Sequence, residues 1–148
     1  MELAIYRERL YPSVPFVLAL SLSAPMVLLA ALPFGLSVAL PLGLFVPTLL
    51  ISFAIFSSPT IDLSDGHLRA GRIRVPTKAL GEVAELQKEE FSQLAGPGAN
   101  PRARLVIRGD IKTGVSIQIV DEDDPTPYLL ISSRRPSELA VALNAHRA

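Results

Sequence analysis

Hydrophobic and polar positions divide this chain into two regions with different patterns. From Leu10 to Ile61 the sequence contains no Asp, Glu, Lys, Arg or His. Two apolar runs lie in that stretch, at residues 14–32 and 36–56. Each is close to the roughly 20 residues that a helix needs to cross a bilayer. Only residues 33–35 separate the runs, which predicts a tight turn between two antiparallel transmembrane helices.

Two alternatives to a membrane hairpin are weaker. A hairpin buried inside a soluble protein would need more chain around it, because both runs are apolar on every face. A cleaved signal peptide would fit Arg7 and Arg9 before the first run. That run is long for a signal peptide, however, and a second apolar run follows it directly. We therefore predict an uncleaved hairpin.

The distribution of basic residues predicts how the hairpin is oriented. Arg7 and Arg9 precede the first run, and the turn at residues 33–35 carries no charge. The positive-inside rule then places the N-terminal segment, residues 1–13, in the cytoplasm and the turn outside. Two crossings return the rest of the chain to the cytoplasmic side. We expect a multi-pass protein of the cytoplasmic membrane with both termini in the cytoplasm.

Prolines and small residues predict the internal structure of the hairpin. Pro25 should kink the first helix, and Pro41 and Pro47 should kink the second, because proline removes a helical hydrogen bond. Small residues let membrane helices approach closely. Those at suitable spacing are Ala39 and Gly43 in the second helix, and Ala19, Ser23 and Ala30 in the first. No charge marks a transport pathway within the runs, which favours an anchor.

Beyond Pro59 the sequence alternates between apolar and polar residues, as β-strands with one buried face do. Strands are expected at residues 60–63, 67–70, 72–75, 80–87, 104–108, 115–120 and 128–132. The strands at 104–108 and 115–120 are expected to pair as a hairpin. A short helix is expected at 88–95 and a terminal helix at about 136–146, where Pro136 suits a first helical position.

These elements predict an α+β membrane protein. A transmembrane helical hairpin is followed by a small, mostly β domain at residues 60–148, with about seven strands and a C-terminal helix. The order of elements resembles the pleckstrin-homology-like fold, in which a bent sheet of seven strands is capped by its last helix.

Candidate catalytic and metal-binding chemistry is sparse. The chain has no cysteine, and its two histidines, His67 and His146, are far apart, which argues against zinc and haem. Residues 121–124 are consecutive acidic residues before Pro125, a pattern typical of a solvated loop and unlike a calcium-binding loop. We expect no catalytic residues, no metal and no cofactor.

One group of basic residues suggests binding. Arg69, Arg72, Arg74 and Lys78 are the first cations after the hairpin. They could contact anionic lipid headgroups or a protein partner. They could also form the solvated face of an edge hairpin, an interpretation favoured because charges often protect edge strands. Nucleic-acid binding is not expected, because acidic and basic residues balance after Ile61 and no aromatic stacking platform accompanies them.

Several separated segments match a known family. They are YRERLYPS, SSPTIDLSDGHLRAGRIRVP, LAGPGANPRA and DPTPYLLISSRRPSELAVAL. In these segments, and over nearly its whole length, the chain resembles a family of small two-span membrane proteins from high-GC Gram-positive bacteria, classified as domain of unknown function 3093. The resemblance implies a bacterial membrane protein and brings no catalytic residues with it.

The expected function is a membrane-anchored, non-enzymatic interaction module that binds a protein partner or a second copy of itself. An accessory subunit of a larger membrane enzyme or transporter is the alternative. An enzyme acting on a lipid is the weakest possibility, since no nucleophile with an adjacent base is evident.

Overall fold

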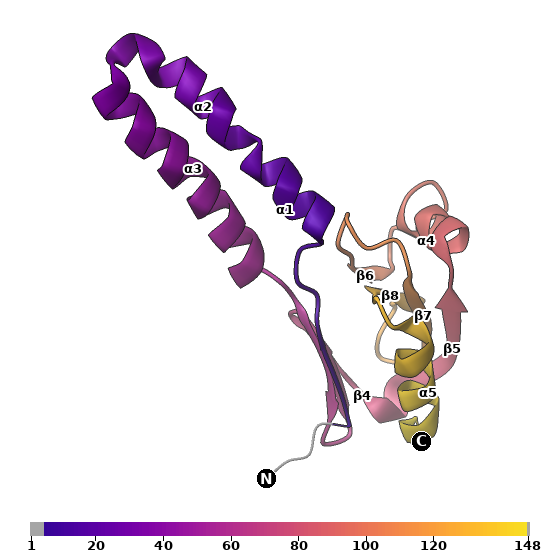
Figure 1. Cartoon of the computed structure of the whole chain (residues 1–148). Helices are drawn as coiled ribbons and strands as arrows, with labels where there is room; N and C mark the ends of the chain where they lie inside the picture. Colours follow the sequence, from indigo (N-terminus) through magenta and orange to yellow (C-terminus); the bar gives the residue numbers. More distant parts are fainter. Residues whose placement is uncertain (1–4, 148) are drawn as a thin grey trace. The chain divides into compact units, whose positions relative to one another are not determined.

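The computed structural model describes residues 5–147, which fold as two units (Figure 1). One unit is Tyr11–Ser58, and the other joins the segment ending at Leu10 to the chain from Pro59 onward. Residues 1–4 of the predicted N-terminal segment and residue 148 of the predicted β domain lie outside the described residues.

The first unit is a helical hairpin. Its first arm consists of α1 (Val14–Ser21) and α2 (Ser23–Ala31), and the short 3₁₀ helix η1 (Leu32–Phe34) leads into the turn. Its second arm is α3 (Leu36–Phe56). Gly35 joins the arms with a φ of 98°, a conformation that L side chains rarely adopt.

The prolines act differently in the two arms. The first arm is divided at Leu22, three residues before Pro25, which has no N–H to donate to the Ser21 carbonyl. This break lies one turn before Pro25, where the sequence predicted a kink. In contrast, α3 continues through Pro41 and Pro47 as a single helix.

Both arms are long and apolar enough to cross a membrane. The spans are Val14–Phe34 and Leu36–Phe56, each with a mean hydropathy of 2.2. The rest of the chain covers little of either span. In the most apolar stretch of 18 residues, 6% is buried in the first span and 17% in the second. Large apolar side chains such as Phe34, Phe53 and Phe56 are exposed.

The second unit begins with a strand that the sequence analysis missed. β1 (Tyr6–Arg9) lies within the segment predicted only as a cytoplasmic N-terminus. It pairs antiparallel with β2 (Thr60–Ser64), which follows the hairpin. The short alternation in Tyr6–Arg9 gave little signal by itself, and its partner lies beyond the hairpin in the sequence.

β1 and β2 belong to an antiparallel sheet of four strands in the order β1-β2-β3-β4 (Figure 1). The other two strands are β3 (His67–Ala70) and β4 (Ile73–Pro76), close to the predicted bounds. The 3₁₀ helix η2 (Thr77–Ala79) then leads to the second sheet.

The second sheet has the strand order β5-β7-β8-β6. Its strands are β5 (Leu80–Leu86), β6 (Arg104–Val106), β7 (Gly114–Ile119) and β8 (Tyr128–Ser132). The predicted hairpin of residues 104–108 with 115–120 was wrong, because β6 pairs parallel with β8 and β7 lies between β5 and β8. Alternation indicates which face of a strand is buried, but it does not indicate which strand is its neighbour.

A single main core joins the two sheets. Its buried side chains include Leu63 and Leu68 from the first sheet and Ile117 and Ile131 from the second. The terminal helix α5 (Pro136–His146) contacts β5 and β7 and adds Leu139 and Leu143 to this core. A smaller cluster lies around Phe91 of α4 (Lys88–Ala95), whose first turn is closed by a capping box between Gln87 and Glu90.

Candidate functional site

Strand register places a row of charged residues on the outer face of the first sheet. Arg7 of β1 is opposite Asp62 of β2, Asp62 is opposite Arg69 of β3, and Arg69 is opposite Arg74 of β4. Side chains alternate along each strand, and the neighbouring positions Leu63, Leu68 and Val75 are buried in the core. The row therefore faces away from the core. We call this surface the basic face.

A tight turn fixes one end of the basic face. Asp65 and Gly66, with φ of 50° and 70°, connect β2 to β3 in the manner of the two-residue turns that suit twisted hairpins. Thr77 stabilises the turn, because its main-chain N–H donates a hydrogen bond to the Gly66 carbonyl at 2.9 Å. His67 Nδ1 lies 2.9 Å from the Asp65 carbonyl. A carbonyl oxygen only accepts, so this ring nitrogen carries the hydrogen.

The basic face contains a polar hollow of about 160 Å³. Its lining residues are Asp62, Ser64, Asp65, His67, Arg69 and Arg74. Asp62 Oδ1 is buried and has no hydrogen-bond partner among the described residues. Arg69 and Arg74 are both exposed. No described carboxylate, including that of Asp62, lies within ion-pair distance of either arginine.

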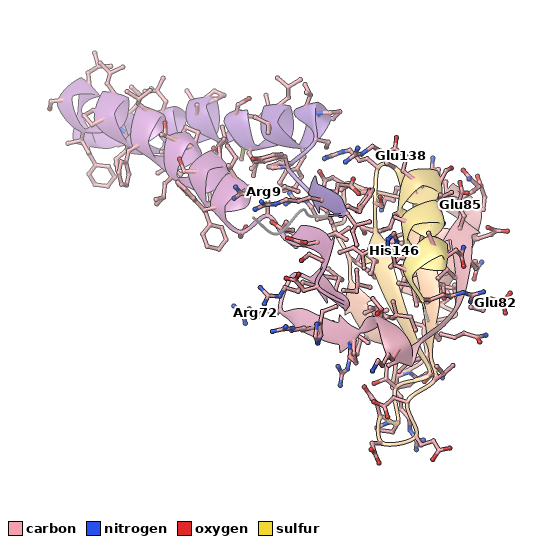
Figure 2. All side chains as sticks on the ribbon, turned by 90° about the horizontal axis from the view of Figure 1, so that it is seen from below. Arg9, Arg72, Glu82, Glu85, Glu138 and His146 are labelled. Carbon is pink, nitrogen blue, oxygen red and sulfur yellow. The ribbon has the colours of Figure 1, made fainter. Side chains whose placement is uncertain are left out.

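Charge is unevenly distributed over this domain. Residues 5–79 carry six basic residues (Arg or Lys) and three acidic residues (Asp or Glu). Residues 80–147 carry eight basic and ten acidic residues. One of the three acidic residues in the first stretch, Glu8, is buried on the inner face of β1. Figure 2 shows Arg9 and Arg72 on one side of the domain, and Glu82, Glu85 and Glu138 on the side of β5 and α5. The basic face therefore suits an anionic ligand or surface.

A family model described as "Protein of unknown function (DUF3093)" matches residues 5–143. The chain belongs to this family. The match starts just before β1 and ends within α5, so the family comprises both the hairpin and the β domain. No curated protein and no solved structure matches the chain.

The four basic residues singled out from the sequence do not lie together in this family member. Arg69 and Arg74 are opposite one another on the basic face, and Arg72 lies in the turn between their strands. Lys78 follows the other end of β4 and lines a separate hollow with Asp121, Glu122 and Asp123. Lys78 is thus separate from the arginines.

Two further arginines of this surface were missed as site residues. Arg7 and Arg9 alternate with the buried Tyr6 and Glu8 in β1, and both are exposed. The alternation was visible in the sequence. Only the pairing of β1 with β2 shows that these arginines share a face with residues beyond the hairpin.

In the hairpin, the structure divides the predicted packing residues. Ala39 and Gly43 are buried in α3, and Ser23 is partly buried with its hydroxyl 2.6 Å from the Leu20 carbonyl. Ala19 and Ala30 are exposed, so they do not form the contact. Gly43 instead lies against Leu28 and the carbonyl of Ala24. Helical phase explains the difference, since the face that meets α3 runs through Ala24, Leu28 and Ala31.

Within residues 5–147, no group of three or more His, Asp or Glu side chains could hold a metal ion. The acidic segment 121–124 forms hydrogen bonds within its own loop, including one from Asp123 N–H to Asp121. The Thr126 hydroxyl and main-chain N–H lower the pKa of Asp124, which also pairs with Arg104 at 3.4 Å.

Proposed function

We propose that this chain is a membrane-anchored, non-enzymatic interaction module. In this proposal the hairpin spans the cytoplasmic membrane, and the β domain lies at its cytoplasmic surface and recruits a protein partner or a second copy. The observation that carries the proposal is the apolar surface of the hairpin. The side chains of Leu18, Met26, Leu44 and Phe53 are 61–73% exposed, and lipid would solvate them where water would not.

The proposed orientation follows the positive-inside rule. Arg7 and Arg9 lie within seven residues of Val14, where α1 begins, whereas η1 and Gly35 carry no charge. The turn at Phe34 would then lie outside the cell, and β1 and β2 would lie in the cytoplasm. Both connections between the hairpin and the domain would be on the cytoplasmic side.

We also propose that the β domain has a pleckstrin-homology-like fold. The four-stranded meander β1–β4, the antiparallel strands β5, β7 and β8, and the C-terminal helix support this proposal. Without β6 these strands number seven. The parallel edge strand β6 would be an addition to that plan.

Single-cysteine labelling tests the membrane proposal cleanly, because the chain has no cysteine of its own. In intact cells, a membrane-impermeant maleimide should label Phe34→Cys and should label Lys88→Cys only after lysis. Labelling of Lys88→Cys in intact cells would reverse the orientation. Recovery of the unmodified chain as a folded monomer in detergent-free buffer would refute the membrane anchor.

A second candidate, an accessory subunit of a membrane complex, is favoured by one feature of the hairpin. An apolar hollow of about 340 Å³ lies where the arms meet and is lined by Ala24, Pro25, Leu28, Leu40, Gly43 and Leu44. A neighbouring transmembrane helix could insert a side chain there.

Purification in mild detergent separates the two candidates. A partner that still copurifies after deletion of residues 60–147, and is lost on Leu40→Ala and Leu44→Ala substitution, would support the accessory subunit. A partner that requires the β domain and tolerates those substitutions would support the interaction module.

A further inference from the structure

Among the buried side-chain polar atoms in the described part of the chain, only Asp62 Oδ1 has no hydrogen-bond partner. A buried acceptor without a hydrogen bond has lost its hydration without compensation, so such an atom in a folded protein requires an explanation. The side chain of Asp62 also lines the hollow of the basic face. Arg69 and Arg74 line the same hollow, and neither forms an ion pair with Asp62.

These groups define the chemistry of a ligand. Two guanidinium groups provide donors for an anionic group such as phosphate, which Arg binds with matched geometry. The carboxylate of Asp62 accepts hydrogen bonds and repels anions, so the ligand must present a donor close to its negative charge. A phosphate that carries a hydroxylated substituent, a polyol phosphate, meets both requirements.

The size of the hollow limits the ligand further. The hollow has a volume of about 160 Å³. This space suits a compact group such as glycerol phosphate. The Asp65–Gly66 turn, held by Thr77, gives the hollow a fixed wall.

Chain connectivity favours a lipid as the source of the glycerol phosphate. Asp62 follows Phe56, the last residue of α3, by six residues. Even a fully extended segment of that length spans at most about 20 Å. If the hairpin spans the membrane, as proposed above, the hollow remains within reach of the headgroups.

We infer that the hollow formed by Asp62, Arg69 and Arg74 binds the glycerol phosphate headgroup of phosphatidylglycerol. The two arginines bind the phosphate, and the Asp62 carboxylate accepts a hydrogen bond from a glycerol hydroxyl. Arg7 adds positive charge from the next strand. The inference rests on the proposed membrane location of the hairpin.

Short-chain lipids titrated into the full-length protein in maltoside micelles test the inference, with binding followed by native mass spectrometry. The probes are dioctanoyl phosphatidylglycerol, dioctanoyl phosphatidylethanol and dioctanoyl phosphatidylcholine. Phosphatidylethanol has the same single negative charge but no headgroup hydroxyl. The wild type should bind phosphatidylglycerol about tenfold more tightly than phosphatidylethanol, the effect of one hydrogen bond to a charged acceptor. Phosphatidylcholine should bind most weakly.

Variants assign the effect to this hollow. The double substitution Arg69→Gln/Arg74→Gln should weaken binding of both anionic lipids by about fivefold per arginine removed. The control Arg102→Gln/Lys112→Gln removes the same charge from exposed residues outside the basic face and should change binding little. Asp62→Ala should abolish the preference for phosphatidylglycerol over phosphatidylethanol while anionic lipids still bind. Circular dichroism should show that each variant is folded.

Three results would overturn the inference. Equal wild-type affinity for phosphatidylglycerol and phosphatidylethanol would show that only charge is recognised. An equal loss in the Arg102→Gln/Lys112→Gln control would show that the hollow is not the site. Free glycerol phosphate is titrated as a fourth probe, and its binding as tightly as the lipid would show that the ligand is soluble. If one of these results were obtained while Phe34→Cys was still labelled from outside the cell, the lipid site would be refuted and the membrane anchor would not. The two proposals can therefore fail separately.

Discussion

Ser133 donates a 2.6 Å hydrogen bond from its hydroxyl to Glu8 Oε2, although 125 residues separate the two in the sequence. The same carboxylate accepts from the Tyr6 hydroxyl at 2.8 Å, and its other oxygen accepts from the Arg134 N–H at 2.9 Å. Glu8 is only 7% exposed. The strand that leads into the hairpin is therefore fastened to the segment that begins the terminal helix.

Replacing the Glu8 carboxylate should destabilise the β domain. Glu8→Ala leaves the Ser133 hydroxyl and the Arg134 N–H without their acceptor, and hydrogen bonds to a charged group contribute about 1.5–3 kcal/mol each. We expect a loss of at least about 2 kcal/mol in the free energy of unfolding, measured by urea denaturation of the full chain in detergent. Glu122→Gln, in an exposed loop, should lose almost nothing. Equal stability of both variants would show that the buried cluster contributes little.

Gly114 should tolerate no side chain. A Cβ at this position would collide with the Ile131 carbonyl oxygen and lie 2.6 Å from Cε2 of Phe91. Because β7 is held between β5 and β8, Gly114→Ala should cost at least about 1–3 kcal/mol. Gly109→Ala is the matched control, since its Cβ would meet nothing within 4 Å. Thermal unfolding of the two variants side by side decides the point, and equal midpoints would contradict the packing of β7.

The contact between the hairpin arms should depend on Gly43. A Cβ there would already lie 3.4 Å from Leu28 Cβ and Cδ1, so Gly43→Ile should force the arms apart and cost about 1–3 kcal/mol. Titration of the detergent-solubilised protein with sodium dodecyl sulfate measures the loss. Ala30→Ile adds the same bulk on the exposed side of α2 and should leave the titration unchanged. If Ala30→Ile were equally damaging, the arms would meet through the face first predicted from sequence.

Tyr6 should make the domain sensitive to strongly alkaline pH. Burial, and then the hydrogen bond to Glu8, raise the pKa of Tyr6 to about 12. The unfolded chain releases this proton near pH 10, so between about pH 10 and 12 the folded state holds more protons than the unfolded state. Stability from Tyr6 is therefore complete below pH 10 and is lost as the pH rises towards 12.

Tyrosinate absorbance measures this titration directly. One of the three tyrosines should ionise near pH 12 in the wild type, and Tyr6→Phe should remove that step. The variant should also lose the extra fall in stability between pH 10 and 12. An unchanged alkaline titration in Tyr6→Phe would show that the late proton does not belong to Tyr6.

The local sequence pattern was sufficient to predict the elements whose structure depends mainly on their own residues. The charge-free stretch from Leu10 to Ile61 determines two apolar helices, because length and composition suffice for them. The Asp65–Gly66 turn, α4 at Lys88–Ala95 and the terminal helix from Pro136 follow from turn and capping residues. Arg69 and Arg74 were likewise recognisable as exposed cations in alternating strands.

Tertiary structure alone decided which segments become neighbours. The pairing of β1 with β2 across the hairpin, the parallel position of β6 beside β8, and the separation of Lys78 from the arginines depend on contacts distant in sequence. Alternation fixes the face of a strand without fixing its partner, and helical spacing fixes a stripe without fixing its phase. For that reason only the folded structure shows that Arg7 lies on the basic face. Only the folded structure shows, likewise, that Ala24 and Leu28 lie beside Gly43, whereas Ala19 and Ala30 are exposed.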